Sequence, residues 1–509
     1  MADSFLLIEQ AALVTGRNAW QSHALPARGL RSIWFSDGPH GLRRPVGSAD
    51  QLGLAGSLPA TCFPVAAAVA NSWDLALAEQ IGAALAAEAI SQDVDCLLGP
   101  GLNIKRSPLG GRNFEYFSED PLLSGKLAAA YIRGIQSRGV AACPKHFAAN
   151  SQEFRRMTSD SVVDQRTLRE IYLAGFEIAV REAGPRAIMA AYNKVNGTHA
   201  SENGWLLTEV LRHEWGFDGV VVTDWGASND IAAGLAAGCS LEMPAAGYAS
   251  ARQIAQAVKS GRLPRSSLAA RASEVANLAR WVARARSARH APTPVSSPAA
   301  SVSDITEHDA VQAADAHHPA APVSDTNKHD AVQAADAHHP AAPGGGATLP
   351  GGAIAAAGPA AAAGDFDAHH ALARRAAAAG AVLLKNEGGL LPLAAGTKVA
   401  VIGRFAEQPR YQGGGSSAVN PRRLENTLEA IKRTGLVMTA YQPGFRPDGR
   451  PDAALREAAV AAAAQAEAVL VYLGLDESAD TEGADRRDLA LPTAQVELLA
   501  AVAAVNPRV

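Results

Sequence analysis

The segment GVVVTDWG, from Gly219 to Gly226, is a run of valines that ends in a threonine, an aspartate and a tryptophan. Valine is β-branched and favours extended backbone, so the run predicts a buried strand with Asp224 directly after it. Other short apolar runs end in polar residues in the same way, and they are VDCLLGPGLNI (Val94–Ile104), GVAACPKHF (Gly139–Phe147), RAIMAAYNKVNG (Arg186–Gly197) and GCSLEMP (Gly238–Pro244).

Helical patterns separate these runs, for example DQRTLREIYLAGFEIAVREAG from Asp164 to Gly184. Strands that alternate with helices predict a parallel sheet. The number and spacing of the strands favour a (β/α)8-type barrel over residues 1–290. Chemistry in such barrels lies at the carboxyl ends of the strands. The residues at those places are Lys145, His146, Tyr192 and Asp224.

Residues 291–365 are rich in alanine, proline, glycine and histidine and contain few large apolar side chains. The string HDAVQAADAHHPAAP occurs at His308–Pro322 and again at His329–Pro343, a tandem repeat with a 21-residue period. Two such copies cannot bury a core, so we expect a flexible low-complexity linker. The paired histidines leave a second hypothesis open, in which the protein is an adaptor whose linker binds a metal.

Residues 366–509 return to a globular pattern that predicts a doubly wound α/β sandwich domain. The chain ends at AAVNPRV, where a further strand is expected. Because a short sheet with an open edge is a poor independent unit, we expect this domain to be incomplete at its C-terminus. The predicted strands are KVAVIG (Lys398–Gly403), VMTAYQPG (Val437–Gly444) and AVLVYLGL (Ala468–Leu475).

The composition of the 509 residues excludes several classes of protein. Lys plus Arg total 46 against 50 Asp plus Glu, which gives a net charge of −4 and no basic footprint for nucleic acid or an anionic membrane. No long apolar run marks a membrane span and no secretory signal begins the chain, so we expect a cytoplasmic protein. The cysteines form no CxxC pair and predict neither a disulfide framework nor a zinc site; they are Cys62, Cys96, Cys143 and Cys239.

Each polar residue near a strand end has a functional and a structural interpretation. Asp224 is either a catalytic carboxylate or the cap of the next helix. Lys145 and His146 either clamp sugar hydroxyls or a carboxylate, or form a surface ion pair. Asp37, in SDGPHGLR, sits where aspartate commonly forms a turn.

Three further segments carry charges or glycines. GRNFEYFSEDP (Gly111–Pro121) indicates either a substrate-binding loop or a network of buried salt bridges. LDESADTEGADRRDLALP (Leu475–Pro492) is, by itself, typical of a solvated acidic loop. QGGGSSAVNP (Gln412–Pro421) lacks the spacing of a phosphate-binding loop, so a nucleotide site there is disfavoured.

Seven segments in this order together resemble glycoside hydrolase family 3, specifically its two-domain, β-glucosidase-type branch. They cover most of both globular zones, and the linker has no counterpart. KHFAANSQEFRRM lacks the KHFPGHG-like segment of another branch, which disfavours N-acetylglucosaminidase activity. The seven segments are SDGPHGLR, GRNFEYFSEDPLLSG, KHFAANSQEFRRM, AAYNKVNG, VVTDWGA, VLLKNEGGLLPL and EGADRRDLALP.

The resemblance implies a retaining exo-β-glycosidase that acts on terminal β-D-glucosyl residues of small glucosides or oligosaccharides, without a metal or organic cofactor. Asp224 matches the family's nucleophile and Glu482 its general acid/base. The expected pKa of Glu482 is raised, because Asp224 is a like charge nearby. Ser417, or its neighbour Ser416, matches a loop that reaches toward the sugar. The remaining sugar-binding residues implied are Asp37, Arg112, Lys145, His146, Arg156, Tyr192 and Trp225.

Two alternatives stay open. The first is a truncated, catalytically impaired fragment that only binds sugars through the barrel. The second is a β-xylosidase or arabinosidase of the same family, since related pockets accept such sugars with few changes.

Overall fold

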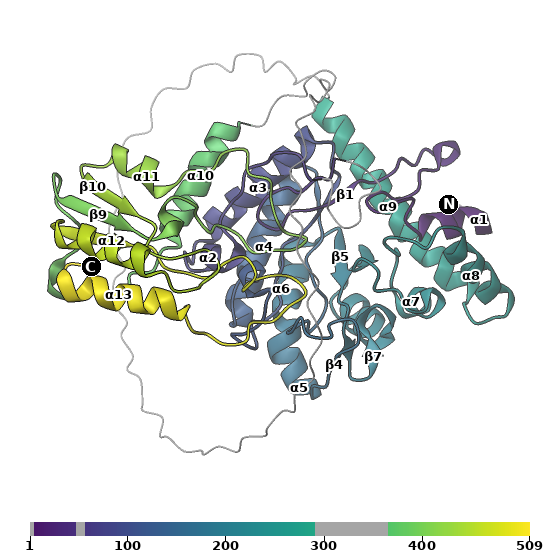
Figure 1. Cartoon of the computed structure of the whole chain (residues 1–509). Helices are drawn as coiled ribbons and strands as arrows, with labels where there is room; N and C mark the ends of the chain where they lie inside the picture. Colours follow the sequence, from purple (N-terminus) through teal and green to yellow (C-terminus); the bar gives the residue numbers. More distant parts are fainter. Residues whose placement is uncertain (1–4, 47–55, 291–364) are drawn as a thin grey trace, which may run out of the picture. The chain divides into compact units, whose positions relative to one another are not determined.

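The computed structural model describes residues 5–46, 56–290 and 365–509 (Figure 1). The tandem repeat and its histidine pairs, within the predicted linker, lie outside the described residues. The hypothesis of a metal-binding linker therefore remains a prediction from the sequence.

The valine run forms strand β8 (Val220–Thr223), as predicted. It pairs in parallel with β5 (Ala187–Ala190), and Val220 lies opposite Ala187. Every residue of both strands is buried, as expected for a parallel sheet that is covered on both faces. This pair places Asp224 directly at a strand end with little conformational freedom.

The other barrel strands join this pair in a ring. β1 (Phe35–Asp37), β2 (Cys96–Leu98) and β3 (Ala141–Ala142) run parallel in that order. A parallel bridge from Phe147 to Ala190 connects the segment after β3 to β5. On the other side of β8, Leu241 bridges Val222.

The ring closes through the N-terminal residues. Glu242 bridges Thr15 in parallel, and antiparallel bridges then connect Gly16 to Ser22 and Gln21 to Trp34, which directly precedes β1. The barrel prediction is therefore confirmed, with an antiparallel hairpin in place of one βα unit. The turn of this hairpin is held by Asn18, whose Oδ1 accepts hydrogen bonds from the backbone N–H of Trp20 (2.9 Å) and Gln21 (2.8 Å).

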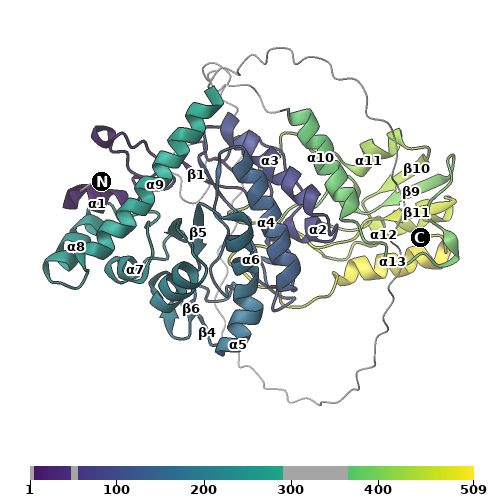
Figure 2. The ribbon, with the colours of Figure 1, turned by 180° about the vertical axis from the view of Figure 1, so that it is seen from behind.

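Helices cover the outside of the barrel (Figure 2). α3 (Leu75–Ser91) lies beside α4 (Pro121–Ser137), which in turn contacts α6 (Ala174–Ala183). Glycine permits the close contact of the first two helices, since a Cβ at position 134 would lie 2.0 Å from the carbonyl oxygen of Glu79. The helix predicted over residues 164–184 forms as α5 (Gln165–Thr167), the π-helical η3 (Leu168–Leu173) and α6.

A second group of helices packs around the segment that closes the ring. α9 (Arg265–His290) contacts α1 (Leu7–Leu13) and α7 (Ile231–Ala237), and both of these contact α8 (Tyr248–Lys259). None of the helices in the described part of the chain combines the length and the apolar character needed to cross a bilayer.

The C-terminal α/β domain contains a parallel sheet of order β10-β9-β11, formed by Val437–Gln442, Lys398–Ile402 and Ala468–Val471. α12 (Ala453–Ala464) and α13 (Thr493–Val505) share a core cluster with one side of the sheet, in which Leu498 and Val502 lie with Ile402. A smaller cluster contains Ile431 and Val401 and covers the other side.

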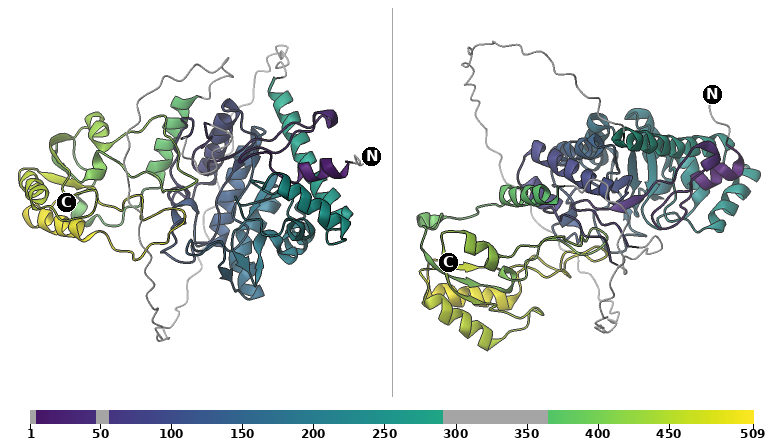
Figure 3. Two further views of the ribbon diagram at one scale, coloured as in Figure 1. Left: turned by 45° about the vertical axis from the view of Figure 1, so that its right-hand side comes forward. Right: turned by 90° about the horizontal axis from the view of Figure 1, so that it is seen from above.

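Helix α10 (Phe366–Ala379), near the start of the last described range, packs against the barrel (Figure 3). Its Ala373 and Ala376 belong to the largest buried cluster of the barrel, and a Cβ at Gly380 would lie 2.3 Å from the carbonyl oxygen of Ala68. The described residues before position 291 and after position 364 thus form one compact unit.

Candidate active site

A cavity of about 570 Å³ lies at the carboxyl ends of the barrel strands. The barrel supplies most of its wall, and the second domain supplies Gly415, Ser416 and Glu482. Its lining residues are Trp20, Asp37, Arg43, Arg112, Lys145, His146, Arg156, Met189, Tyr192, Asp224, Trp225, Gly415, Ser416 and Glu482.

Asp224 enters this cavity from the end of β8. Its Oδ1 accepts a hydrogen bond from the backbone N–H of Trp225 (2.7 Å). Its Oδ2 forms no hydrogen bond to another described residue, and Nε2 of His146 lies 3.6 Å away. Burial raises the pKa of Asp224 to about 6, although the Arg112 and Lys145 cations act in the opposite direction.

The alternative role of Asp224 as a helix cap belongs instead to Asp230. Oδ1 of Asp230 accepts the N–H groups of Ala232 (2.9 Å) and Ala233 (3.2 Å) at the start of α7. Asp224 itself does not cap α7, and it lines the cavity.

Glu482 approaches the same cavity on a loop of the second domain. Its Oε1 lies 2.7 Å from Nη1 of Arg156 and 3.9 Å from Nη1 of Arg112. Its Oε2 accepts a hydrogen bond from the backbone N–H of Ser416 (2.7 Å). Both carboxylate oxygens thus have donors.

These donors determine the charge of Glu482. Burial by itself would raise its pKa, but the Arg112 and Arg156 guanidiniums and the hydrogen bond from Ser416 outweigh burial and hold the pKa of Glu482 well below its usual value. The prediction of a raised pKa for Glu482 is therefore wrong for this arrangement. The reason is that the guanidiniums of Arg112 and Arg156 lie within 4 Å of the Glu482 carboxylate, and the sequence does not show that these residues are neighbours.

A buried ion-pair network forms part of the cavity wall. Arg112 donates from Nε to Oε2 of Glu115 (2.8 Å), and Nζ of Lys145 lies 3.4 Å from both Glu115 Oε1 and Asp37 Oδ1. Arg112 and Lys145 outweigh the effect of burial and lower the pKa of Glu115, whereas burial raises the pKa of Asp37. Nη1 of Arg112 forms no hydrogen bond among the described residues, although it lies within ion-pair distance of Glu482, and Arg112 lines the cavity.

The structure decides between the two interpretations of Lys145 and His146. Both residues are 1% exposed, so a surface ion pair is excluded. Nδ1 of His146 lies 3.1 Å from the hydroxyl of Tyr116. Burial, reinforced by Arg112 and Lys145, holds the pKa of His146 well below its usual value, so its ring is neutral.

Aromatic side chains form another part of the wall. Trp225 donates from Nε1 to the carbonyl oxygen of Ala19 (2.8 Å), and its ring centroid lies 5.4 Å from that of Trp20. The guanidinium of Arg156 lies 4.7 Å from the ring centroid of Tyr192. Such rings offer apolar faces to the C–H groups of a sugar.

The two candidate serines differ in position. Ser416 lines the cavity and donates its N–H to Glu482, and its carbonyl oxygen lies 3.4 Å from Nη1 of Arg43. Ser417 is buried, its Oγ makes no hydrogen bond to a described residue, and it does not line the cavity.

Sequence reasoning did not single out several residues of the wall. Arg43 and Met189 lie inside segments quoted for other reasons, SDGPHGLR and RAIMAAYNKVNG. Trp20 carries no such signal, because it enters the site only when the hairpin closes the barrel.

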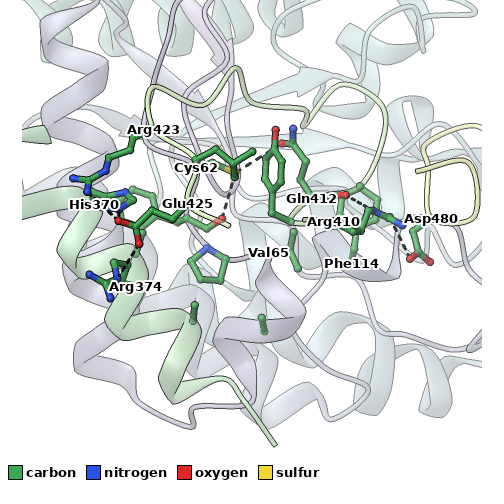
Figure 4. Close-up of a pocket in the computed structure, with 18 of the residues that line it drawn as sticks. Cys62, Val65, Phe114, His370, Arg374, Arg410, Gln412, Arg423, Glu425 and Asp480 are labelled. Atoms are coloured by element: carbon green, nitrogen blue, oxygen red, sulfur yellow. Dashed lines mark hydrogen bonds and ion pairs between the residues drawn. The ribbon is translucent and has the colours of Figure 1, made fainter. Parts of the chain in front are cut away.

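A second cavity, of about 630 Å³, lies beside α10, and no residue lines both cavities (Figure 4). The carboxylate of Glu425 in its wall lies 3.4 Å from Arg374 and 2.9 Å from Arg423. Asp480 lies 3.4 Å from Arg410. Both Glu425 and Asp480 thus form ion pairs with arginines of this wall, whereas Oδ2 of Asp224 forms no hydrogen bond to a described residue. Within the described ranges, no group of three His, Cys, Asp or Glu side chains is arranged to hold a metal ion.

Comparisons with known proteins show the family to which the chain belongs. Residues 41–278 match the model of the glycosyl hydrolase family 3 N-terminal domain, and residues 381–509 match that of the family's C-terminal domain. The chain is 42% identical over 99% of its length to thermostable β-glucosidase B of Acetivibrio thermocellus. It is 39% identical, again over 99%, to an exo-α-(1→6)-L-arabinopyranosidase of Bifidobacterium breve. The chain spans 58% of the length of each of these two relatives.

Solved structures show the same fold. The crystal structure of a family 3 β-glucosidase from Bifidobacterium adolescentis is similar to all of this chain, with a TM-score of 0.80 and 38% identity, and the chain covers 62% of it. β-Glucosidase 3B of Thermotoga neapolitana, in complex with α-D-glucose, is similar to 99% of this chain, with a TM-score of 0.76 and 29% identity over 66% of its own chain. Because both the N-terminal and the C-terminal domain of the family match this chain, the protein belongs to glycosyl hydrolase family 3.

Proposed function

We propose that this chain carries the active site of a retaining exo-β-glycosidase that hydrolyses terminal β-D-glucosyl residues. The observation that supports this proposal is a single cavity that receives Asp224 from a barrel strand and Glu482 from the second domain. Retaining glycosidases require such a pair of carboxyl groups, one as nucleophile and one as acid/base. The β-glucosidase names of the A. thermocellus and B. adolescentis relatives support the choice of sugar.

In the first step, Oδ2 of Asp224 attacks the anomeric carbon and forms a covalent ester with the sugar. The bond from that carbon to the glycosidic oxygen breaks, and the leaving oxygen takes the proton of Glu482. In the second step, Glu482 takes a proton from water, the water oxygen attacks the anomeric carbon, and Asp224 is released as a carboxylate.

Protonation of Glu482 depends on Arg156. In the free protein the guanidinium of Arg156 lies 2.7 Å from Glu482 and favours the charged carboxylate. A sugar hydroxyl that binds Arg156 would draw this cation away from Glu482. The pKa of Glu482 would then rise toward the value that a general acid needs.

Asp37, Lys145 and His146 are proposed to bind sugar hydroxyls. They offer a carboxylate acceptor, an ammonium donor and a neutral ring donor on one wall of the cavity. Arg112 adds Nη1, which forms no hydrogen bond to a described residue. Trp225 is proposed to stack on the apolar face of the sugar. None of these roles requires a metal or an organic cofactor.

The test combines an assay with a covalent trap. We expect the 509-residue chain to release nitrophenol from 4-nitrophenyl β-D-glucopyranoside. An activated 2-deoxy-2-fluoroglucoside should leave one sugar attached, and peptide mass mapping should locate it at Asp224. A label on another residue would overturn the assignment of the nucleophile. Glucose binding without nitrophenol release would support the alternative of a sugar-binding chain.

A second candidate substrate is an arabinopyranoside, favoured by the name of the B. breve relative. This pentose lacks the exocyclic hydroxymethyl group of glucose. Parallel assays with 4-nitrophenyl α-L-arabinopyranoside and β-D-xylopyranoside, compared by kcat/KM, distinguish the candidates. A kcat/KM at least tenfold higher for either pentoside would replace the glucoside in the proposal.

A further inference from the structure

The loop that carries Glu482 connects β11 to α13, over residues 472–492, and contains no helix or regular strand. The sheet of its own domain therefore does not hold Glu482 directly. Within its own domain, the Glu482 loop pairs with the segment around Gly414, which accepts the N–H of Glu482 (3.1 Å). Two other acidic residues, Asp485 and Glu153, connect the loop to the barrel.

Asp485 binds a set of backbone amides on the barrel. Its Oδ1 accepts hydrogen bonds from the N–H of Gly111 (3.0 Å) and of Glu153 (2.9 Å). Its Oδ2 accepts from the N–H of Glu153 (3.0 Å) and of Phe154 (2.8 Å). Hydrogen bonds from amides to a charged carboxylate are among the stronger ones in proteins.

Glu153 makes the reciprocal contact from the barrel to the loop. Its Oε2 accepts a hydrogen bond from the N–H of Gly483 (2.9 Å), the residue that follows Glu482. The same oxygen accepts from Nη1 of Arg156 (2.9 Å), which also contacts Glu482. Glu153 thus connects the loop backbone to Arg156, which together with Arg112 lowers the pKa of Glu482.

The fit between the two segments is close. A Cβ at Gly111 would lie 1.8 Å from the carbonyl oxygen of Ala484 and 2.5 Å from that of Thr481. On the far side of Asp485, the N–H of Arg486 donates to the carbonyl oxygen of Leu109 (2.8 Å). The barrel therefore contacts the loop on both sides of Glu482.

We propose that Asp485 and Glu153 are positioning residues, which form a reciprocal clamp that fixes the Glu482 loop on the barrel. The clamp acts through Glu482 and touches no substrate atom itself. This inference rests on the proposed function for the role of Glu482, but the clamp also has a readout that requires no turnover.

The kinetic test compares Asp485→Ala and Asp485→Asn in the 509-residue chain with Glu482→Ala as reference. The substrates are aryl β-D-glucosides whose leaving groups range from 2,4-dinitrophenol, which needs no protonation, to phenol, which does. We expect kcat/KM for the phenyl glucoside to fall by about a hundredfold in Asp485→Ala, the scale of a misplaced catalytic group. The dinitrophenyl glucoside should stay within about twofold of wild type.

The control is Asp488→Asn, an exposed acid of the same loop that accepts only the N–H of Ala490 within the described structure. It should leave both substrates unchanged. Gly111→Ala tests the clamp from the barrel side, because its methyl group displaces the loop without removing a charge. It should reproduce the leaving-group dependence of Asp485→Ala.

Hydrogen exchange measures the clamp without turnover. In Asp485→Ala the amides of Gly111, Glu153 and Phe154 should exchange at least tenfold faster, while β5 and β8 exchange as in wild type. Unchanged exchange at these three amides would overturn the clamp. A uniform loss of kcat/KM across leaving groups in Asp485→Ala, with the steep dependence retained in Glu482→Ala, would also overturn it. If Glu482→Ala itself shows no such dependence, the proposed acid/base role fails and exchange alone decides the clamp.

Discussion

The barrel and the second domain hold the two catalytic candidates in opposite ways. Asp224 follows a fully buried strand, its backbone N–H donates to Ala190 on the neighbouring strand, and its Oδ2 forms no hydrogen bond to a described residue. Glu482 lies on a loop, and donors from both domains occupy both of its oxygens. Asp224 is therefore fixed in position by its strand, but hydrogen bonds compensate its charge only in part. Glu482 lies on a loop without regular structure, and donors compensate its charge at both oxygens.

This difference explains why the pKa of Asp224 is raised while the pKa of Glu482 is lowered. Burial dominates at Asp224 and raises its pKa to about 6. Nearby cations dominate at Glu482 and lower its pKa. The free protein therefore favours a charged Glu482, and in the proposed mechanism a substrate that engages Arg156 raises the pKa of this acid. The contrast between these two residues leads to five predictions.

The largest effect is expected for Asp224→Asn. Because the nucleophile acts on every substrate, kcat should fall by about 10⁴-fold or more for dinitrophenyl and phenyl glucosides alike. Steady-state kinetics with both substrates measures this. Retention of dinitrophenyl glucoside hydrolysis would show that Asp224 is not the nucleophile.

Glu482→Ala should instead distinguish between leaving groups. General acid catalysis contributes roughly 10²–10⁴-fold, so phenyl glucoside hydrolysis should fall by that range in kcat/KM. The dinitrophenyl glucoside should be little affected in the same measurement. Added azide should accelerate turnover by replacing the water that Glu482 activates. Equal losses for both substrates would assign Glu482 a structural role.

For the dinitrophenyl glucoside, whose leaving group needs no proton from Glu482, the pH dependence of kcat/KM should reflect the raised pKa of Asp224. Attack requires the ionised carboxylate, which is lost as pH falls through about 6. The acidic limb should therefore decrease by about tenfold for each pH step of one below that value. A limb near pH 4 in the pH–rate profile would mean that burial does not govern Asp224.

The smallest effect is on stability. The pKa of Asp224 is raised from 3.8 to about 6 in the fold, so its ionised form costs about 3 kcal/mol above pH 6, and this cost disappears below about pH 4. Asp224→Asn should raise the melting temperature by a few degrees near pH 8 and have little effect near pH 4. Differential scanning calorimetry at the two pH values tests this.

Glu482→Gln should change the melting temperature in the opposite direction from Asp224→Asn. The lowered pKa of Glu482 means that its charged form stabilises the fold at neutral pH, and that this stabilisation is lost as pH falls through its folded value. The variant should melt below wild type near pH 8. If both variants shift the melting temperature in the same direction, the contrast between the two sites is wrong.

Much of the barrel follows from local patterns. The valine run before Asp224 and the apolar run before Lys145 predicted strand ends correctly, because β-branched and apolar runs specify buried strands and the ends of parallel strands meet at one edge. The hairpin at Asn18 was not predicted, because a single side chain that closes a turn leaves no periodic signal. Trp20 was missed for the same reason.

In the second domain, local sequence patterns do not predict the contacts of the acidic loop. The acidic loop is typical of a solvated segment when taken alone, and only the family resemblance assigned Glu482 a role. The structure places Asp485 of that loop on barrel amides and Asp480 beside Arg410. The sequence contains the charges of this loop but not the partners that bury and neutralise them.

The amino-acid sequence by itself therefore determined the strands, the helices and the identity of the carboxylates at the strand ends, since these depend on neighbours close along the chain. Only the tertiary structure decided which carboxylate is charged, that Ser416 rather than Ser417 lines the cavity, and that Asp485 and Glu153 join the two domains. The physical reason is that electrostatic energies and hydrogen bonds depend on distances between segments far apart in sequence, and these distances exist only in the folded chain.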